Sequence, residues 1–185
     1  MKVIFLGATS GCGLFGLLNL IQSMKTGEKL HQAFILARRP DEFRSTLVDT
    51  HNVNPALLEK NIFIVKGDAT VLGDVTSLFQ KAAREEGDGA PVDAIVSSVG
   101  GKLIFGSNPL KAPTLSPSNI CQDATKVLLE AINAEFPANS GKTQPRIVVI
   151  TSNGIGPYAH AKVPFMLKGM YSWMLDEPHA DKEVS

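Results

Sequence analysis

The sequence predicts an α/β fold built on a doubly wound parallel β-sheet. Short apolar runs of β-type residues alternate along the chain with longer stretches of helical character, an order typical of βαβ units. The apolar runs are nearly continuous, as expected of strands that are covered on both faces. The first run is followed at once by a glycine-rich turn and a helical stretch. Together these observations favour a parallel sheet with helices on both sides.

The composition predicts one domain over residues 1–185. Of the 185 residues, 44% are hydrophobic and 19% are charged, which suffices for a buried core. The formal net charge is zero with both signs interspersed, so neither nucleic acid nor an anionic membrane is expected as a partner. Cys12 and Cys121 form no CxxC pair and no Cys/His cluster, so no metal site is expected. Sparse cysteines and the lack of a long apolar run predict a cytoplasmic protein.

The elements follow in order along the chain. Strands are expected at residues 3–6, 33–37, 61–66, 93–98 and 146–151. Helices are expected at residues 14–24, 41–49, 71–86 and 118–136, the last with Ser116, Pro117 and Ser118 as start signals. The Gly- and Pro-rich segment 100–117 is expected to be a long loop, of the kind that often serves as a lid or a binding loop.

The stretch "FLGATSGCGLFG" is typical of a turn that binds a dinucleotide pyrophosphate. Gly7 allows the sharp exit from the first strand, Gly11 and Gly13 let the backbone approach the phosphates, and Gly16 is expected to let the helix pack closely on the sheet. A helix start at this point also directs N–H groups at an anion. The expected contacts are Gly7, Thr9, Ser10, Gly11, Cys12 and Gly13. The alternative is a purely structural turn between strand and helix.

The spacing Gly7-x-x-x-Gly11-x-Gly13 resembles the phosphate-binding turn of the short-chain dehydrogenase/reductase superfamily. The resemblance extends over essentially the whole chain and is closest to atypical NAD(P)H-binding members, the NmrA-like and flavin-reductase-like proteins. It implies a Rossmann fold with strand order 3-2-1-4-5. The family would add a sixth strand near Ser185, where this sequence ends. The last strands are therefore expected to be missing, in either a truncated or a naturally short chain.

The end of the second expected strand predicts which dinucleotide is bound. In "FILARRP", Arg38 and Arg39 follow the strand, and no acidic residue appears before Asp41. An acidic residue there would bind a ribose 2′-hydroxyl, whereas a guanidinium suits a 2′-phosphate. NADP(H) is therefore the expected cofactor. The alternative is a solvated pair of arginines at the end of a strand.

Two further segments resemble cofactor contacts of the superfamily. In "VKGDAT", Asp68 and Ala69 correspond to the residues that hold the adenine edge, although Asp68 could equally cap a helix starting at Val71. In "VSSVGG", the small residues resemble the turn that passes under the nicotinamide ribose. The contacts expected in this second segment are Ser98, Val99, Gly100 and Gly101.

The resemblance also implies candidate catalytic residues. Many members use a serine with a Tyr-x-x-x-Lys pair, and this chain has Ser152, Tyr158 and Lys162. Ser152 is also expected to face the nicotinamide. The serine precedes the tyrosine by only six positions, and Pro157 and Pro164 leave barely one helical turn for the Tyr-x-x-x-Lys pair. These residues by themselves therefore do not decide whether the three form a working triad. Lys182 matches a lysine that reaches the cofactor or substrate in some relatives.

The function implied is that of an NADP(H)-dependent oxidoreductase, which transfers hydride to a small carbonyl, quinone or flavin-like substrate. Two alternatives stay open at this point. One is a non-catalytic regulator that senses NADP(H), as NmrA-like proteins do, and the other is an isomerase or cyclase on the same fold. The expected partner is a small-molecule substrate. A homodimer, in which the partner is a second copy of the chain, is the assembly allowed for.

Overall fold

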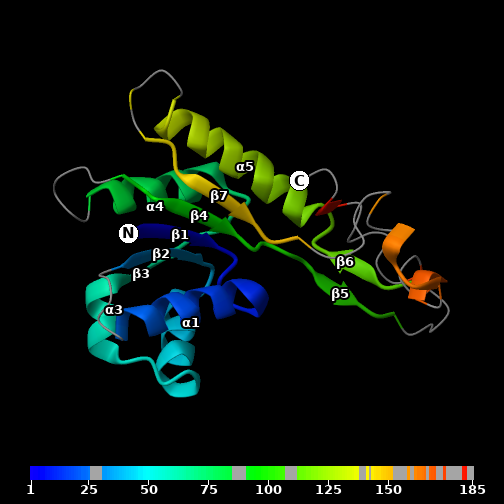
Figure 1. The fold of residues 1–185 in the computed structure, drawn as a ribbon, viewed down its shortest axis with the longest axis horizontal. Coiled ribbons are helices and arrows are strands. Elements are labelled where there is room, and N and C mark those ends of the chain that lie inside the picture. Colours follow the sequence, from blue (N-terminus) through cyan, green and yellow to red (C-terminus); the bar gives the residue numbers. More distant parts are fainter. Residues whose placement is uncertain are drawn as a thin grey trace. The chain divides into compact units, whose positions relative to one another are not determined.

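A parallel sheet forms the centre of the larger part of the chain. In the computed structural model, the residues described are 1–25, 31–84, 91–106, 112–137, 141, 143–151, 158, 161–165, 167–169, 173, 181 and 182. Within them, five parallel strands are ordered β3-β2-β1-β4-β7 (Figure 1). These strands are β1 (Lys2–Leu6), β2 (Gln32–Ala37), β3 (Ile62–Lys66), β4 (Ala94–Ser97) and β7 (Arg146–Val149). Because β7 is the fifth strand expected from sequence, the predicted Rossmann-like order 3-2-1-4-5 is confirmed.

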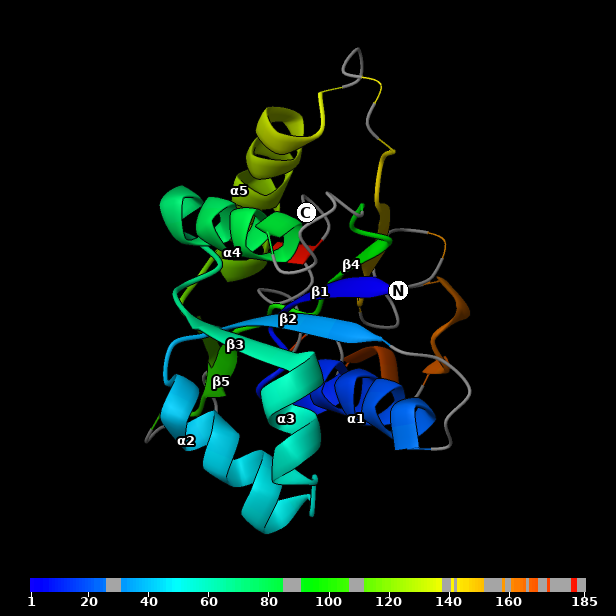
Figure 2. The same cartoon turned by 90° about the vertical axis from the view of Figure 1, so that its left-hand side faces the viewer.

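Helices cover both faces of this sheet. Figure 2 shows α1, α2 and α3 on one face and α4 and α5 on the other, so the sheet is doubly wound. The helices are α1 (Gly11–Lys25), α2 (Pro40–Ser45), α3 (Pro55–Asn61), α4 (Leu72–Arg84) and α5 (Ile120–Glu135). A π-helical segment, η1 (Thr46–Thr50), directly continues α2, and together they correspond to the helix expected at residues 41–49.

The apolar strands are buried on both faces, as their unbroken hydrophobic runs predict. In β1, Val3 and Phe5 belong to the core cluster that also contains Leu17 of α1. Ile4 and Leu6 are exposed by only 0% and 1%, although their side chains point to the opposite face of the strand. Continuous burial of this kind explains why the strand sequences show no polar alternation.

Helix α3 is an element that the sequence analysis missed. Its start carries a clear signal, because the Asn54 side chain accepts a hydrogen bond from the N–H of Ala56 and Pro55 occupies the first helical turn. Asn61 was expected to open the third strand, which is wrong. It ends α3, and its side-chain amide donates to the backbone carbonyl of His31. Seven residues are too few for helical periodicity to stand out from the sequence.

The chain divides into two compact units, residues 1–98 with 127–150 and residues 99–126 with 151–185. In the second unit, β5 (Lys102–Ile104) and β6 (Thr114–Ser116) pair antiparallel, with Leu103 opposite Leu115. The expectation of a loop throughout segment 100–117 is therefore wrong at these six positions, because cross-strand pairing supplies order that composition alone does not indicate. That residues 1–185 form a single domain stays a prediction.

No helix in the described part of the chain combines the length and the apolar character that crossing a membrane requires.

Candidate functional site

The glycine-rich turn lies at the carboxyl end of β1. Gly7 has a φ of 81° and Gly11 a φ of 58°, a left-handed backbone region that side chains with a Cβ rarely adopt. Helix α1 starts at Gly11, and its first helical hydrogen bond runs from the N–H of Leu14 to the carbonyl of Ser10. The backbone N–H groups before Leu14 have no partner within the helix, which makes this end of α1 suited to an anion.

Gly13 is the point of closest approach between α1 and the sheet. A Cβ placed on Gly13 would lie 2.7 Å from the carbonyl oxygen of Gly7 and 2.8 Å from the Cβ of Ser98. A Cβ on Gly16 would meet only Phe5, at 3.9 Å, which is an ordinary van der Waals distance. The prediction that Gly16 is the spacer between helix and sheet is therefore wrong. Gly13 has that role, because the helix approaches the sheet most closely at its first turn.

The carboxyl end of β4 lies beside the same turn. The N–H of Ser98 donates to the carbonyl of Leu6 at 2.8 Å, which continues the ladder between β4 and β1 past the last strand residue. Ser97 is buried, and its carbonyl accepts from the N–H of Ile150. Parallel strands bring their carboxyl ends to one edge of the sheet, so Ser98 and the glycine turn meet there although they are far apart in sequence.

A cavity of about 400 Å³ opens at the carboxyl ends of β2 and β3. It is lined by Arg38, Lys66, Gly67, Asp68 and Asp74. Two of the residues expected to bind the cofactor, Arg38 and Asp68, thus share one cavity. A Cβ on Gly67 would lie 2.8 Å from both the Cβ of Asp74 and the Cδ1 of Leu36, so only glycine fits at this position.

The Asp68 side chain stabilises the turn that precedes α4. Its Oδ1 accepts hydrogen bonds from the N–H of Thr70 at 3.0 Å and from the Thr70 hydroxyl at 2.8 Å. The Thr70 N–H lowers the pKa of Asp68 below 3.8, and the Thr70 hydroxyl and the Arg38 charge act in the same direction against the opposing effect of burial. Because α4 begins only at Leu72, the alternative of Asp68 as a helix N-cap is wrong.

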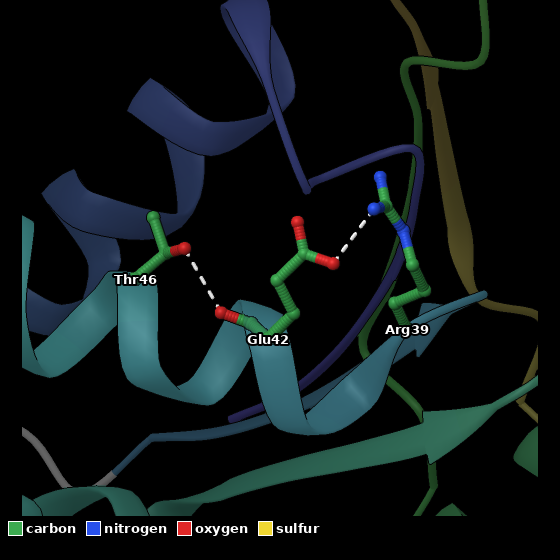
Figure 3. A network of polar contacts seen from close by, with 3 residues as sticks. All are labelled: Arg39, Glu42 and Thr46. Carbon is green, nitrogen blue, oxygen red and sulfur yellow. Dashed lines mark hydrogen bonds and ion pairs between the residues drawn. The ribbon is translucent and has the colours of Figure 1, made fainter.

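The neighbouring arginine has a different environment. Arg39 forms an ion pair of 2.7 Å with Glu42, whose backbone carbonyl accepts from the Thr46 hydroxyl (Figure 3). The Arg39 and Glu42 side chains are 77% and 60% exposed, so this pair contributes little to stability. The alternative of a solvated arginine thus describes Arg39, whereas Arg38 lines the cavity. A contact between Arg39 and the cofactor stays a prediction.

Val99, Gly100 and Gly101 belong to the second unit. A Cβ on Gly101 would lie 2.8 Å from Cδ1 of Leu115, so this glycine has a packing role beside the β-hairpin, whereas nothing lies within 4 Å of a Cβ on Gly100. The carbonyl of Val99 accepts from the Cys121 thiol at 3.3 Å.

The first turn of α5 is capped by a residue that sequence reasoning missed. Asp181 is 5% exposed, and its two carboxylate oxygens accept from the N–H groups of Cys121 at 2.9 Å and Gln122 at 3.1 Å. Burial, together with this carboxylate, raises the pKa of the Cys121 thiol to about 12. The expected start signals lie just upstream at Ser118 and its neighbours. The actual acceptor is about 60 positions away, so no local pattern could have indicated it.

The candidate catalytic residues are described only in part. Ser152 lies outside the described residues, as does Pro157. Tyr158 is 80% exposed, and the Lys162 ammonium lies 5.6 Å from the centre of its ring. Lys162 is thus near the tyrosine, in a cation–π arrangement with the ring. A catalytic role for these residues stays a prediction.

No protein-family model matches the chain. A protein named reductase pytE from Aspergillus terreus is 36% identical over 182 residues, which cover 98% of this chain and 64% of that protein. A protein named oxidase pynE from Aspergillus niger is 32% identical over 199 residues, which cover 98% of this chain and 67% of that protein. Solved structures with the same fold include a short-chain type dehydrogenase/reductase from Mycobacterium ulcerans. It has a TM-score of 0.55 at 16% identity, over 97% of this chain and 63% of that one.

The chain belongs to the same family as oxidase pynE, and its fold is that of the short-chain dehydrogenase/reductases of known structure. A member from Caenorhabditis elegans, determined with cofactor, has a TM-score of 0.54 at 19% identity, over 91% of this chain and 58% of that one. At such identities the solved structures show the fold alone. The chain spans a little under two thirds of the length of reductase pytE. These two relatives are named as a reductase and an oxidase.

Proposed function

We propose that the chain is an NADP(H)-dependent oxidoreductase of the atypical branch of the superfamily, which acts on a small carbonyl, quinone or flavin-like substrate. The fold shared with short-chain dehydrogenase/reductases and the reductase and oxidase names of the two relatives support the reaction class. We further propose that it acts in the cytoplasm, as a homodimer, on small molecules.

The observation that carries the cofactor assignment is the cavity beside Arg38. In this fold the residue after the second strand meets the adenosine ribose, and an arginine there accommodates a 2′-phosphate. Arg38 directly follows β2, lines the cavity together with Lys66, and has no acidic neighbour before Asp41 in the chain. A guanidinium and an ammonium provide the charge that a phosphate requires.

The glycine turn provides the second part of the fit. Because Gly13 has no Cβ, α1 can approach the sheet closely at its first turn. The positive φ angles of Gly7 and Gly11 turn the backbone from β1 toward the start of α1. In the proposed complex the backbone N–H groups of the glycine turn bind the pyrophosphate, with Thr9, Ser10 and Cys12 beside them. Asp68 and Ala69 hold the adenine edge, and residues 98–101 lie under the nicotinamide ribose.

The bound dinucleotide supplies or accepts the hydride. The chain then has to orient a substrate against it and provide a proton. We assign the orienting role to Ser152, and the proton to Tyr158 with Lys162 in support.

The turnover experiment measures NADPH oxidation with a panel of quinones, flavins and small carbonyls. We expect steady consumption with one class, and a Ser152→Ala variant should lose about a hundredfold or more in kcat because the substrate is no longer oriented. Thr151→Ala, which removes the neighbouring hydroxyl, is the matched control and should change kcat little. Tight NADPH binding without turnover on any substrate would contradict the oxidoreductase and favour the regulator.

The thiol of Cys12 offers a direct test of where the dinucleotide binds. Cys12 is exposed on the glycine turn, whereas Cys121 is buried and its pKa is raised to about 12, so a maleimide should modify Cys12 alone. With NADPH at about ten times its Kd, we expect labelling to slow roughly tenfold, because about nine tenths of the sites are occupied. The labelling rate is followed by mass spectrometry, with Cys12→Ser as the unlabelled control. An unchanged rate at a concentration where fluorescence shows binding would place the cofactor elsewhere.

A further inference from the structure

We propose that Asp74 is a positioning residue for adenine recognition, holding the backbone of Asp68 where its carboxylate meets the exocyclic amino group of the adenine. This inference rests on the proposed dinucleotide site. Asp74 was not among the residues expected from sequence, and it touches neither the glycine turn nor a candidate catalytic residue in any contact described above. It lines the cavity that Arg38 and Asp68 share.

The central contact is a hydrogen bond between the two acidic residues. The N–H of Asp68 donates to Oδ2 of Asp74 at 2.8 Å. Asp74 is itself held in the first turn of α4, where its own N–H donates to the carbonyl of Val71 at 3.1 Å. A carboxylate near a helix N-terminus is favourably placed with respect to the helix dipole. The helix therefore provides a firm support for the turn that carries Asp68.

Close packing removes the remaining freedom of this turn. Gly67 packs so closely between Asp74 and Leu36 that a Cβ there would come within 2.8 Å of each. The N–H of Gly67 also donates to the carbonyl of Ala37 at 3.1 Å, which ties the turn to the end of β2. The backbone at Gly67 and Asp68 is thus held from the sheet on one side and from α4 on the other.

The Asp68 side chain is oriented separately. Both hydrogen bonds from Thr70 reach the same oxygen, Oδ1. Thr70 therefore sets the direction of the carboxylate, while Asp74 sets the position of the backbone from which it extends. An ionised carboxylate only accepts hydrogen bonds, so a fixed one suits the amino group of adenine and disfavours the carbonyl oxygen of hypoxanthine.

The test compares NADPH with its deaminated analogue, reduced nicotinamide hypoxanthine dinucleotide phosphate. Binding of each to the full chain is measured by nicotinamide fluorescence, and the readout is the ratio of the two Kd values. For the wild type we expect NADPH to bind about tenfold more tightly or better, from a hydrogen bond to a charged group. Asp74→Ala should reduce this ratio to about threefold or less. Asp74→Asn keeps an oxygen that can accept the N–H of Asp68, and should retain most of the discrimination.

Two controls separate positioning from other effects. Asp41→Ala removes an exposed acidic residue of the first turn of α2 that does not line the cavity, and should leave the ratio unchanged. Thr70→Val removes one of the two bonds to Oδ1 and should lower the ratio in part, because Thr70 orients the carboxylate. Should Asp74→Ala fail to fold, a loss of discrimination in Asp74→Asn would still overturn the role of Asp74.

The outcomes distinguish this inference from the function on which it rests. A wild type that binds neither dinucleotide contradicts the proposed function. A wild type that binds both equally, an Asp74→Ala variant with an unchanged ratio, or an Asp74→Asn variant as impaired as the alanine would each overturn the role of Asp74 while leaving NADPH binding in place.

Discussion

Replacing Gly13 by alanine is expected to weaken NADPH binding at least tenfold and to lower the free energy of unfolding by about 1–3 kcal/mol, the usual cost of an added methyl group in a packed site. The added Cβ would stand 2.7 Å from the Gly7 carbonyl oxygen and 2.8 Å from the Cβ of Ser98. Neither atom lies at the end of a flexible side chain, so α1 must move away from the sheet. That movement takes the amides of its first turn away from the phosphates.

Gly16→Ala is the matched control for this substitution. It adds the same methyl group to the same helix, at a site where the nearest atom is 3.9 Å away. Because alanine favours a helix over glycine, we expect Gly16→Ala to stabilise the fold by about 0.5–1 kcal/mol and to leave NADPH binding unchanged. Thermal unfolding and fluorescence titration measure both effects. A Gly13→Ala variant that behaves like Gly16→Ala would contradict the close approach of helix and sheet.

Replacing Arg38 by alanine is expected to weaken NADPH binding by roughly tenfold to a hundredfold, the range for losing charged hydrogen bonds. Binding of NADH should change less than about threefold, because NADH has no 2′-phosphate for the guanidinium to bind. The measurement is the Kd of each dinucleotide for wild type and variant. An equal loss for the two dinucleotides would disprove the assignment of Arg38 to the 2′-phosphate.

Arg39→Ala is the control, because this substitution removes the same charge one position along the chain. Its guanidinium is paired with Glu42, and both side chains are largely exposed. We therefore expect Arg39→Ala to reduce NADPH binding only slightly, with no change in the preference over NADH. A loss as large as that of Arg38→Ala would assign the 2′-phosphate to both arginines.

Most of the sheet could be predicted because its information is local. The runs that include Val3, Ala33 and Ile62 are continuous and apolar, and a strand buried on both faces requires that pattern over only a few residues. The glycine turn was also recognisable from the sequence. Gly7 and Gly11 adopt a left-handed backbone conformation, which favours glycine at each position independently of the rest of the fold. The order of the strands was implied by the resemblance to the superfamily.

The rest was decided by approaches between segments distant in sequence. Gly13 and Gly16 look alike along α1, and only the position of Ser98 makes one of them irreplaceable. Arg38 and Arg39 are also equivalent in the sequence. In the structure, Arg38 lines the cavity and Arg39 pairs with Glu42.

The sequence by itself therefore determined the strands, the phosphate-type turn and the superfamily resemblance. The tertiary structure alone decided which glycine excludes a side chain, which arginine lines the cavity, and that Asp74 holds Asp68 and Asp181 caps α5. The physical reason is that secondary structure follows from periodicity within one segment. Steric exclusion and hydrogen bonding depend instead on distances between segments, which a local pattern does not contain.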